Sequence, residues 1–243
     1  MYFPVTVPYR ISPTMSQHTG DLYEHNLSYL EHKYTQLDKY GTDLYANRRP
    51  ELVSKASEIL GVDKTDSIKE LALNFREDIA ILHNGVLESI CFCFPSSWTP
   101  SQRIGKSLAE IHNPVADGDT LRKMSQRLAE TMATQGNFRR YVWTISTTGE
   151  LSNHPSIIKP TVTEDTIIDD LYFRMETQTT CPLGDGVSSL FLVLVETCPL
   201  LEVWDSEKSK LIVDSINSMS DNVLEYKNLI DVKRLLNNMS TKL

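Results

Sequence analysis

The hydrophobic period of the chain changes at Glu77, and this change constrains the fold more than any other feature of the sequence. Between Gly20 and Leu73 apolar residues recur at spacings of three and four, which is typical of amphipathic helices. Beyond Glu77, two strand-like runs, residues 78–82 and 86–94, flank His83-Asn84-Gly85, a combination that favours a tight hairpin turn. The sequence therefore predicts an α+β fold in which a helical layer precedes an antiparallel sheet.

The rest of the chain extends this pattern. Strands are predicted at residues 138–147, 170–180 and 188–197, short helical pieces at 98–111, and longer helices at 119–133 and 214–236. The helix at 119–133 should turn four residues inward: Leu121, Met124, Leu128 and Met132.

Two strands, a cluster of helices and then three strands is the order of a PAS domain, in which helices cover one face of the sheet and a flat cofactor can lie between helix and sheet. We expect one domain over residues 1–243, made of an N-terminal helical layer (1–75), a PAS-like core (76–204) and C-terminal helices (205–243).

The composition disfavours two classes of function. A formal net charge of -8, with the basic residues scattered among carboxylates, argues against a nucleic-acid partner. The longest apolar run, residues 190–195, is far shorter than the roughly 20 residues of a membrane span, and the N-terminus lacks a signal-peptide pattern. We expect a cytoplasmic protein whose four cysteines are free thiols.

Two neighbouring motifs carry a resemblance to a known family. Residues 92–98 read Phe-Cys-Phe-Pro-Ser-Ser-Trp, and residues 104–115 read Ile-Gly-Lys-Ser-Leu-Ala-Glu-Ile-His-Asn-Pro-Val. Together with Glu77-Asp78, Pro8-Tyr9-Arg10 and the strands around Trp143 and Arg174, they resemble the haem subunit of haem-dependent oxidative N-demethylases, the dimethylamine monooxygenase type.

The resemblance implies a b-type haem and the oxidation, by dioxygen, of a small secondary amine such as dimethylamine to a primary amine and formaldehyde. The chain has neither a Rossmann glycine fingerprint nor a cysteine cluster with iron–sulfur spacing. Electrons should therefore come from partner reductase subunits, and the resemblance implies that these carry NADPH, flavin and iron–sulfur sites.

His112 is the expected axial ligand of the haem iron, and the resemblance is the main reason. It follows an apolar residue, lies in the best-matched motif and is fixed just before Pro114. The rivals are His154 and the Cys-Pro pairs at Cys181 and Cys198, because a thiolate can also ligate haem.

Arg174, Glu176 and Gln178 alternate along one predicted strand and so project from the same face of the sheet. If that face is solvent, they form a polar surface. If it is the cofactor face, Arg174 and Gln178 would bind the cofactor, Arg174 at a propionate, and Glu176 would hold a dialkylammonium ion. Trp143 is expected either to add a cation–π wall to that catalytic site or to pack in the core.

Two positions depart from the family's pattern, since Val142 stands where the family usually has Asn, and Thr177 where it usually has Arg. Each departure removes a polar group that a propionate or a substrate could use. Three alternatives therefore stay open: a haem-based PAS sensor, a cofactor-free PAS-like interaction module and, more remotely, a non-haem enzyme.

Overall fold

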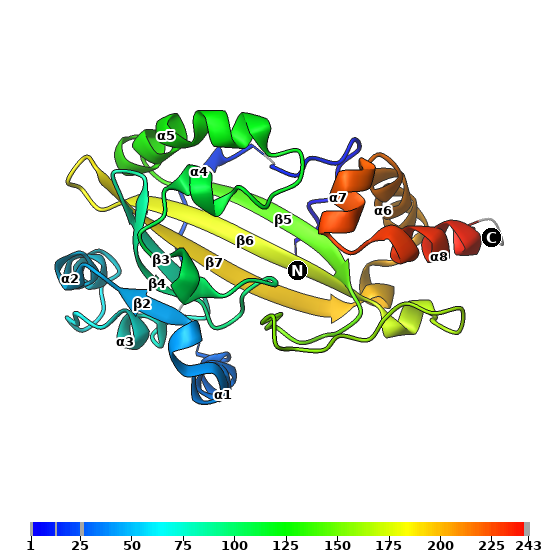
Figure 1. Cartoon of the computed structure of the whole chain (residues 1–243), viewed down its shortest axis with the longest axis horizontal. Helices are drawn as coiled ribbons and strands as arrows, with labels where there is room; N and C mark the ends of the chain where they lie inside the picture. Colours follow the sequence, from blue (N-terminus) through cyan, green and yellow to red (C-terminus); the bar gives the residue numbers. More distant parts are fainter. Residues whose placement is uncertain (1, 13, 25–26, 241–243) are drawn as a thin grey trace.

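The computed structural model describes residues 2–12, 14–24 and 27–240 and has an α+β fold built on a seven-stranded sheet (Figure 1). The strand order is β1-β5-β6-β7-β3-β4-β2, and each neighbouring pair is antiparallel. The strands are β1 (Ser16–Gln17), β2 (Tyr45–Asn47), β3 (Asp78–His83), β4 (Val86–Cys91), β5 (Phe138–Ser146), β6 (Tyr172–Pro182) and β7 (Ser188–Pro199). The α-helices are α1 (Leu30–Tyr40), α2 (Pro50–Ile59), α3 (Ile68–Ala72), α4 (Leu108–Ile111), α5 (Asp119–Thr134), α6 (Ser206–Asn217), α7 (Asp221–Tyr226) and α8 (Ile230–Ser240).

The predicted hairpin is confirmed. β3 and β4 pair antiparallel, with His83 opposite Val86, so that Asn84 and Gly85 alone make the turn. Both turn residues have positive φ, 51° and 75° respectively, the backbone that a two-residue hairpin of matching twist requires and that Asn and Gly adopt most easily.

The N-terminal helical layer is confirmed as α1, α2 and α3, and Ser67 caps α3 by accepting a hydrogen bond from the amide of Glu70. The prediction missed two strands, because β1 pairs with β5 and β2 pairs with β4. Strands of two and three residues are too short to show an alternating pattern, so only the neighbouring strand reveals them.

The inward face of α5 differs from the predicted one. Met132 is buried, Leu121 and Leu128 are half-buried, but Met124 is 48% exposed. Ser125 and Ala129 lie buried in the stripe instead. Small side chains let the helix approach the sheet closely. A prediction based on the spacing of large apolar residues does not include them.

Helices pack on both faces of the sheet, whereas the sequence predicted one. Alternate residues of β3 separate the two layers: Leu82 packs with α4 and α5 through Leu108, Ala129 and Met132, whereas Ile79 belongs to the core that contains α2 and α3. The C-terminal helices cover a second core on that other face, around Phe173 of β6. Figure 1 shows α5 running above the sheet and α6–α8 grouped at one end.

The C-terminal segment forms three helices, where one was predicted over residues 214–236. α6 begins earlier, after the N-cap Asp205, and Ser220 caps α7 by accepting from the amide of Val223. The capping hydrogen bond that starts a helix depends on a single side chain. The spacing of apolar residues therefore does not show where one helix ends and the next begins. No helix among the described residues is long and apolar enough to cross a membrane.

Candidate functional site

A cavity of about 610 Å³ lies on the face of the sheet that α4 and α5 cover, and residues 226–228 and 232 of the C-terminal segment also border it. Its volume is in the range of small-molecule and cofactor sites. It is bordered by the five residues that the sequence singled out, from β5, β6 and the end of α4: His112, Trp143, Arg174, Glu176 and Gln178. The face that carries Arg174, Glu176 and Gln178 is therefore a cavity wall and not a polar outer surface.

His112 ends α4 and is held in a defined tautomer. Its Nδ1 lies 2.6 Å from the carbonyl oxygen of Leu108, and because a carbonyl only accepts, Nδ1 must donate. Burial lowers the pKa of His112, which favours the neutral ring. Nε2 is then left with a lone pair, the arrangement that metal-ligating histidines typically have.

The rival axial ligands do not border the cavity. His154 is 2% exposed, its ring stacks on Tyr40, and its Nε2 is 3.7 Å from Asp43. The thiol of Cys181 is buried and donates to the carbonyl of Pro182. Of the histidines and cysteines that the structure describes, His112 alone borders this cavity.

A row of hydrogen bonds crosses the cavity wall and holds Glu176. Its Oε1 accepts from the hydroxyl of Ser96 at 2.5 Å, and its Oε2 accepts from Nε2 of Gln178 at 2.9 Å. The Oε1 of Gln178 in turn accepts from Nε of Arg140 at 2.7 Å. Glu176 is the only carboxylate among the residues bordering the cavity that the structure describes.

Arg174 has a structural role in the part of the cavity wall formed by residues 94–96. Its guanidinium donates to the carbonyls of Leu151 at 2.6 Å and Phe94 at 3.2 Å, and to Ser96 at 3.2 Å. A guanidinium with those three partners has few N–H groups left for a propionate.

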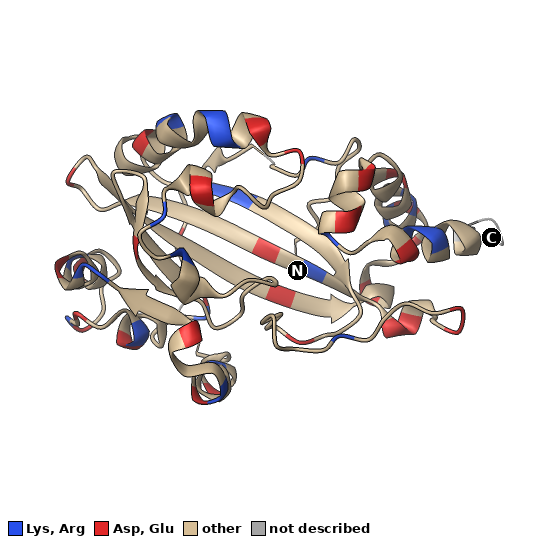
Figure 2. Ribbon diagram, in the orientation of Figure 1, with Lys and Arg blue, Asp and Glu red and all other residues tan. Residues whose placement is uncertain are grey.

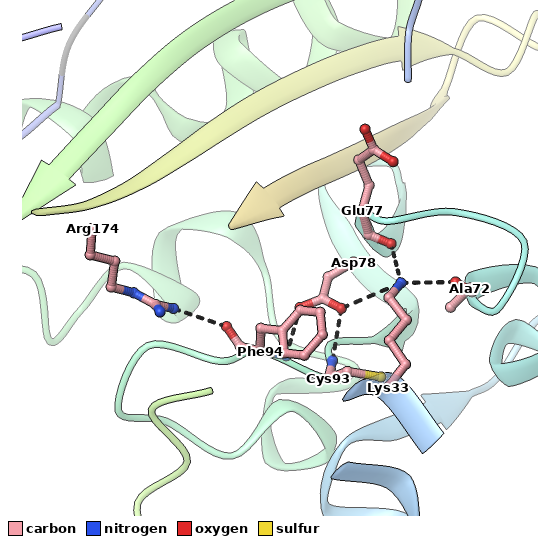
Figure 3. A network of polar contacts seen from close by, with 7 residues as sticks. All are labelled: Lys33, Ala72, Glu77, Asp78, Cys93, Phe94 and Arg174. Atoms are coloured by element: carbon pink, nitrogen blue, oxygen red, sulfur yellow. Dashed lines mark hydrogen bonds and ion pairs between the residues drawn. The ribbon is translucent and has the colours of Figure 1, made fainter. Parts of the chain in front are cut away.

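A buried ion pair holds the strand end that leads into residues 94–96 of this cavity wall (Figure 3). The carboxylate of Asp78 accepts from the amides of Cys93 and Phe94, each at 2.8 Å, and lies 3.8 Å from the ammonium of Lys33. Lys33 also donates to the carbonyls of Ala72 and Glu77. This network ties α1 and α3 to the strand end that carries the Phe-Pro-Ser-Ser-Trp motif.

Trp143 borders the cavity, but its indole lies on the other face of the sheet from Arg174, Glu176 and Gln178. Trp143 pairs with Met175 in the sheet, whereas Val142 pairs with Glu176, so the indole projects from the opposite face. Its ring stacks on Phe173 at 5.7 Å and meets Tyr9 edge-on at 5.8 Å. This geometry is that of the core-packing alternative.

The sequence predicted Arg174 at the site but did not indicate the other basic residues of the cavity. Five Lys and Arg residues border it, against one carboxylate, although the chain as a whole carries a net charge of -8. Figure 2 shows charges of both signs over the helices and few along the central strands. The basic residues are Arg103, Arg140, Lys159, Arg174 and Lys227, and they come from segments far apart in sequence, so no local pattern marks them.

Both lysines among these cations carry signs of a buried environment. Burial lowers the pKa of Lys227 to about 8, although the carboxylate of Glu176 opposes this. Burial also lowers the pKa of Lys159, whose Nζ bonds only to Ser97 among the described residues. Cations in such places favour an anionic ligand.

The cavity residues fit a haem. A neutral imidazole with one nitrogen tied to a carbonyl can ligate iron, the apolar side chains of α5, β4 and β7 can contact a porphyrin, and the basic residues can pair with its two propionates. Among the described residues, no three His, Cys, Asp or Glu side chains cluster as a site for a bare metal ion.

The two positions that the sequence reading singled out as departures, Val142 and Thr177, have different surroundings. Val142 borders the cavity and pairs directly with Glu176. Thr177 lies between Glu176 and Gln178 on β6 and so projects from the opposite face. Of the two positions, only Val142 borders the cavity.

Comparison with known proteins identifies the family of the chain. A family model described as "haem-dependent oxidative N-demethylase, alpha subunit-like" matches residues 6–236, which is nearly the whole chain. No curated protein matches the chain. Because the match includes both the sheet and the helices around the cavity, the chain belongs to the family of haem-dependent oxidative N-demethylase, alpha subunit-like proteins.

Proposed function

We propose that this protein binds a b-type haem through His112 and oxidises a methyl carbon of a small secondary amine. Family membership indicates haem dependence and an oxidative N-demethylase-like function. The observation that carries the proposal is the neutral imidazole of His112, whose Nδ1 is tied to Leu108 and whose other nitrogen is available for iron. For dimethylamine the balanced reaction consumes dioxygen, two electrons and two protons and yields methylamine, formaldehyde and water.

Haem, when bound, supplies the activation of dioxygen. The protein's own residues bind and orient the amine. Glu176, held by Ser96 and Gln178, is the carboxylate that would stabilise an ammonium group in the cavity and so orient the amine. The propionates would pair with basic residues other than Arg174, whose guanidinium already bonds to the cavity wall.

The alpha-subunit description implies a multisubunit enzyme. We propose that partner subunits with NADPH, flavin and iron–sulfur sites deliver the two electrons, and that the complex works in the cytoplasm. The PAS-like reading of the core is part of this proposal, and the order of β3 and β4, then α4 and α5, then β5, β6 and β7 supports it.

The haem ligand is tested with His112→Gln, in which a side-chain amide can still donate to the carbonyl of Leu108. The wild-type chain, expressed with haem precursor, should show a Soret band, and the variant should lose the histidine-ligated spectrum while its circular dichroism stays unchanged. His83→Gln, at a half-buried histidine bonded to Ser188, is the matched control. An unchanged spectrum in His112→Gln would refute this ligand.

The amine site is tested with Glu176→Gln, which removes the charge and keeps the shape. Titration with dimethylamine should shift the Soret band of the wild type, and the variant should need roughly 10- to 100-fold more amine at equal haem content, the cost of losing a hydrogen bond to a charged group. Equal affinities would remove Glu176 from the site. A Soret band that ignores amines in the wild type would favour a sensor, and absence of the band a cofactor-free module.

A further inference from the structure

Arg140 is a cavity-lining guanidinium without a carboxylate partner among the described residues. Its Nε donates to Gln178 at 2.7 Å and its Nη1 to Ser12 at 3.3 Å, and no described residue accepts from Nη2. A guanidinium in such a place favours a ligand carboxylate, which can accept two parallel hydrogen bonds.

We infer that the amine taken by this site is an N-methylated amino acid, with its amine on Glu176 and its carboxylate on Arg140. The inference rests on the proposed function and names its substrate class. Gln178 is the structural reason, because its amide bonds to both groups: Nε2 donates to Glu176 at 2.9 Å and Oε1 accepts from Arg140 at 2.7 Å. One amide and two hydrogen bonds therefore join the two groups on neighbouring strands. An α-amino acid could join them in the same way, with its ammonium donating to Glu176 and its carboxylate accepting from Arg140.

Arg140 borders the same cavity as His112 and Glu176. A carboxylate held by Arg140 would therefore keep the attached amine and its methyl group in the cavity that the expected iron ligand also borders. Dimethylamine has no group that could use this guanidinium.

The charge count of the cavity supports a third anionic group. The two propionates of haem require two cations, and Arg103, Lys159 and Lys227 border the cavity in addition to Arg140. Glu176 lies close enough to Lys227 to oppose the lowering of its pKa. Arg140 is therefore not needed to neutralise the cofactor.

With N-methylglycine as the example, the bond between nitrogen and the methyl carbon breaks after that carbon is oxidised. N-methylglycine, dioxygen, two electrons and two protons give glycine, formaldehyde and water. Dioxygen is the oxidant, and a nicotinamide-linked partner subunit is the reductant.

The experiment titrates the haem-reconstituted full chain with N-methylglycine and with dimethylamine, followed by Soret difference spectra and by calorimetry. We expect the wild type to bind N-methylglycine at least roughly tenfold more tightly, and Arg140→Gln to bring the two affinities to within about threefold of each other. Arg140→Lys should retain part of the preference, since it keeps the charge without the planar fork.

Arg139→Gln is the matched control, because Arg139 is the neighbouring residue on β5, projects from the other face and bonds to Thr179 and the carbonyl of Asp21. It should keep the full preference for N-methylglycine. Equal binding of the two amines by the wild type, an unchanged preference in Arg140→Gln, or loss of haem from Arg140→Gln at unchanged fold would each overturn the inference. Absence of a Soret band in the wild type would instead overturn the proposed function itself.

Discussion

Replacing Lys33 by Met should be among the most destabilising single changes in this chain. The side chains of Lys33 and Asp78 are both fully buried and lie 3.8 Å apart. Methionine fills a similar volume but leaves the carboxylate of Asp78 without its cation. Breaking a buried ion pair by removing one partner costs about 3–5 kcal/mol, a large part of the stability of a typical domain.

The cost should depend on pH, because burial already raises the pKa of Asp78 from 3.8 to about 6 despite the opposing charge of Lys33. That increase corresponds to about 3 kcal/mol. An acid whose pKa is raised by folding stabilises the fold below its unfolded pKa and loses that contribution as the pH rises through its folded pKa. Wild-type stability from this group therefore falls between about pH 4 and 6.

Without Lys33 the pKa of Asp78 rises further, and the window of lost stability extends to higher pH. The variant should then lose about 3–5 kcal/mol at pH 8. At pH 4.5, where Asp78 is protonated in both proteins, the loss should be about 1–2 kcal/mol, from the hydrogen bonds that Lys33 makes to Ala72 and Glu77.

Urea unfolding followed by circular dichroism at the two pH values measures this directly. Lys39→Met is the control, since Lys39 is exposed on the same helix and its replacement should cost less than about 0.5 kcal/mol. Adding Asp78→Asn to Lys33→Met should recover stability at pH 8, because the uncompensated charge is gone. A loss below about 1 kcal/mol at pH 8, or the same loss at both pH values, would refute this reasoning.

Three further predictions concern the turn and the cavity. Gly85→Ala should lower the unfolding free energy by about 1–2 kcal/mol in urea titrations, because φ is 75° and the new Cβ would meet Ala129 at 3.2 Å; no measurable loss would contradict this. Lys227→Met should remove the gain in stability that the wild type shows as the pH rises from 8 toward 10.5, since burial depresses the lysine pKa; parallel stability curves would exclude it. Ser96→Ala should weaken amine binding roughly three- to tenfold in Soret titrations without loss of haem, because Ser96 holds both Glu176 and Arg174; unchanged affinity would mean that this contact does not position Glu176.

The sequence alone determined the features that depend on neighbouring residues. The Asn84-Gly85 turn follows from the positive φ that these residues tolerate, and the alternation of Arg174, Glu176 and Gln178 put them on one face because strand side chains alternate. The motif around His112 identified the family for the same reason, since a run of adjacent residues preserves its own pattern.

The tertiary structure decided how those residues are used. Arg174 could not be assigned from sequence, because the carbonyls that occupy its guanidinium come from residues 94 and 151, far from it in the chain. Trp143 faces the core because its partner on the neighbouring strand is Met175. Arg140 faces the cavity because Gln178 and Ser12 hold it there. Hydrogen bonds and packing between distant segments have no periodic signature, so only the folded arrangement of the sheet and its helices reveals them.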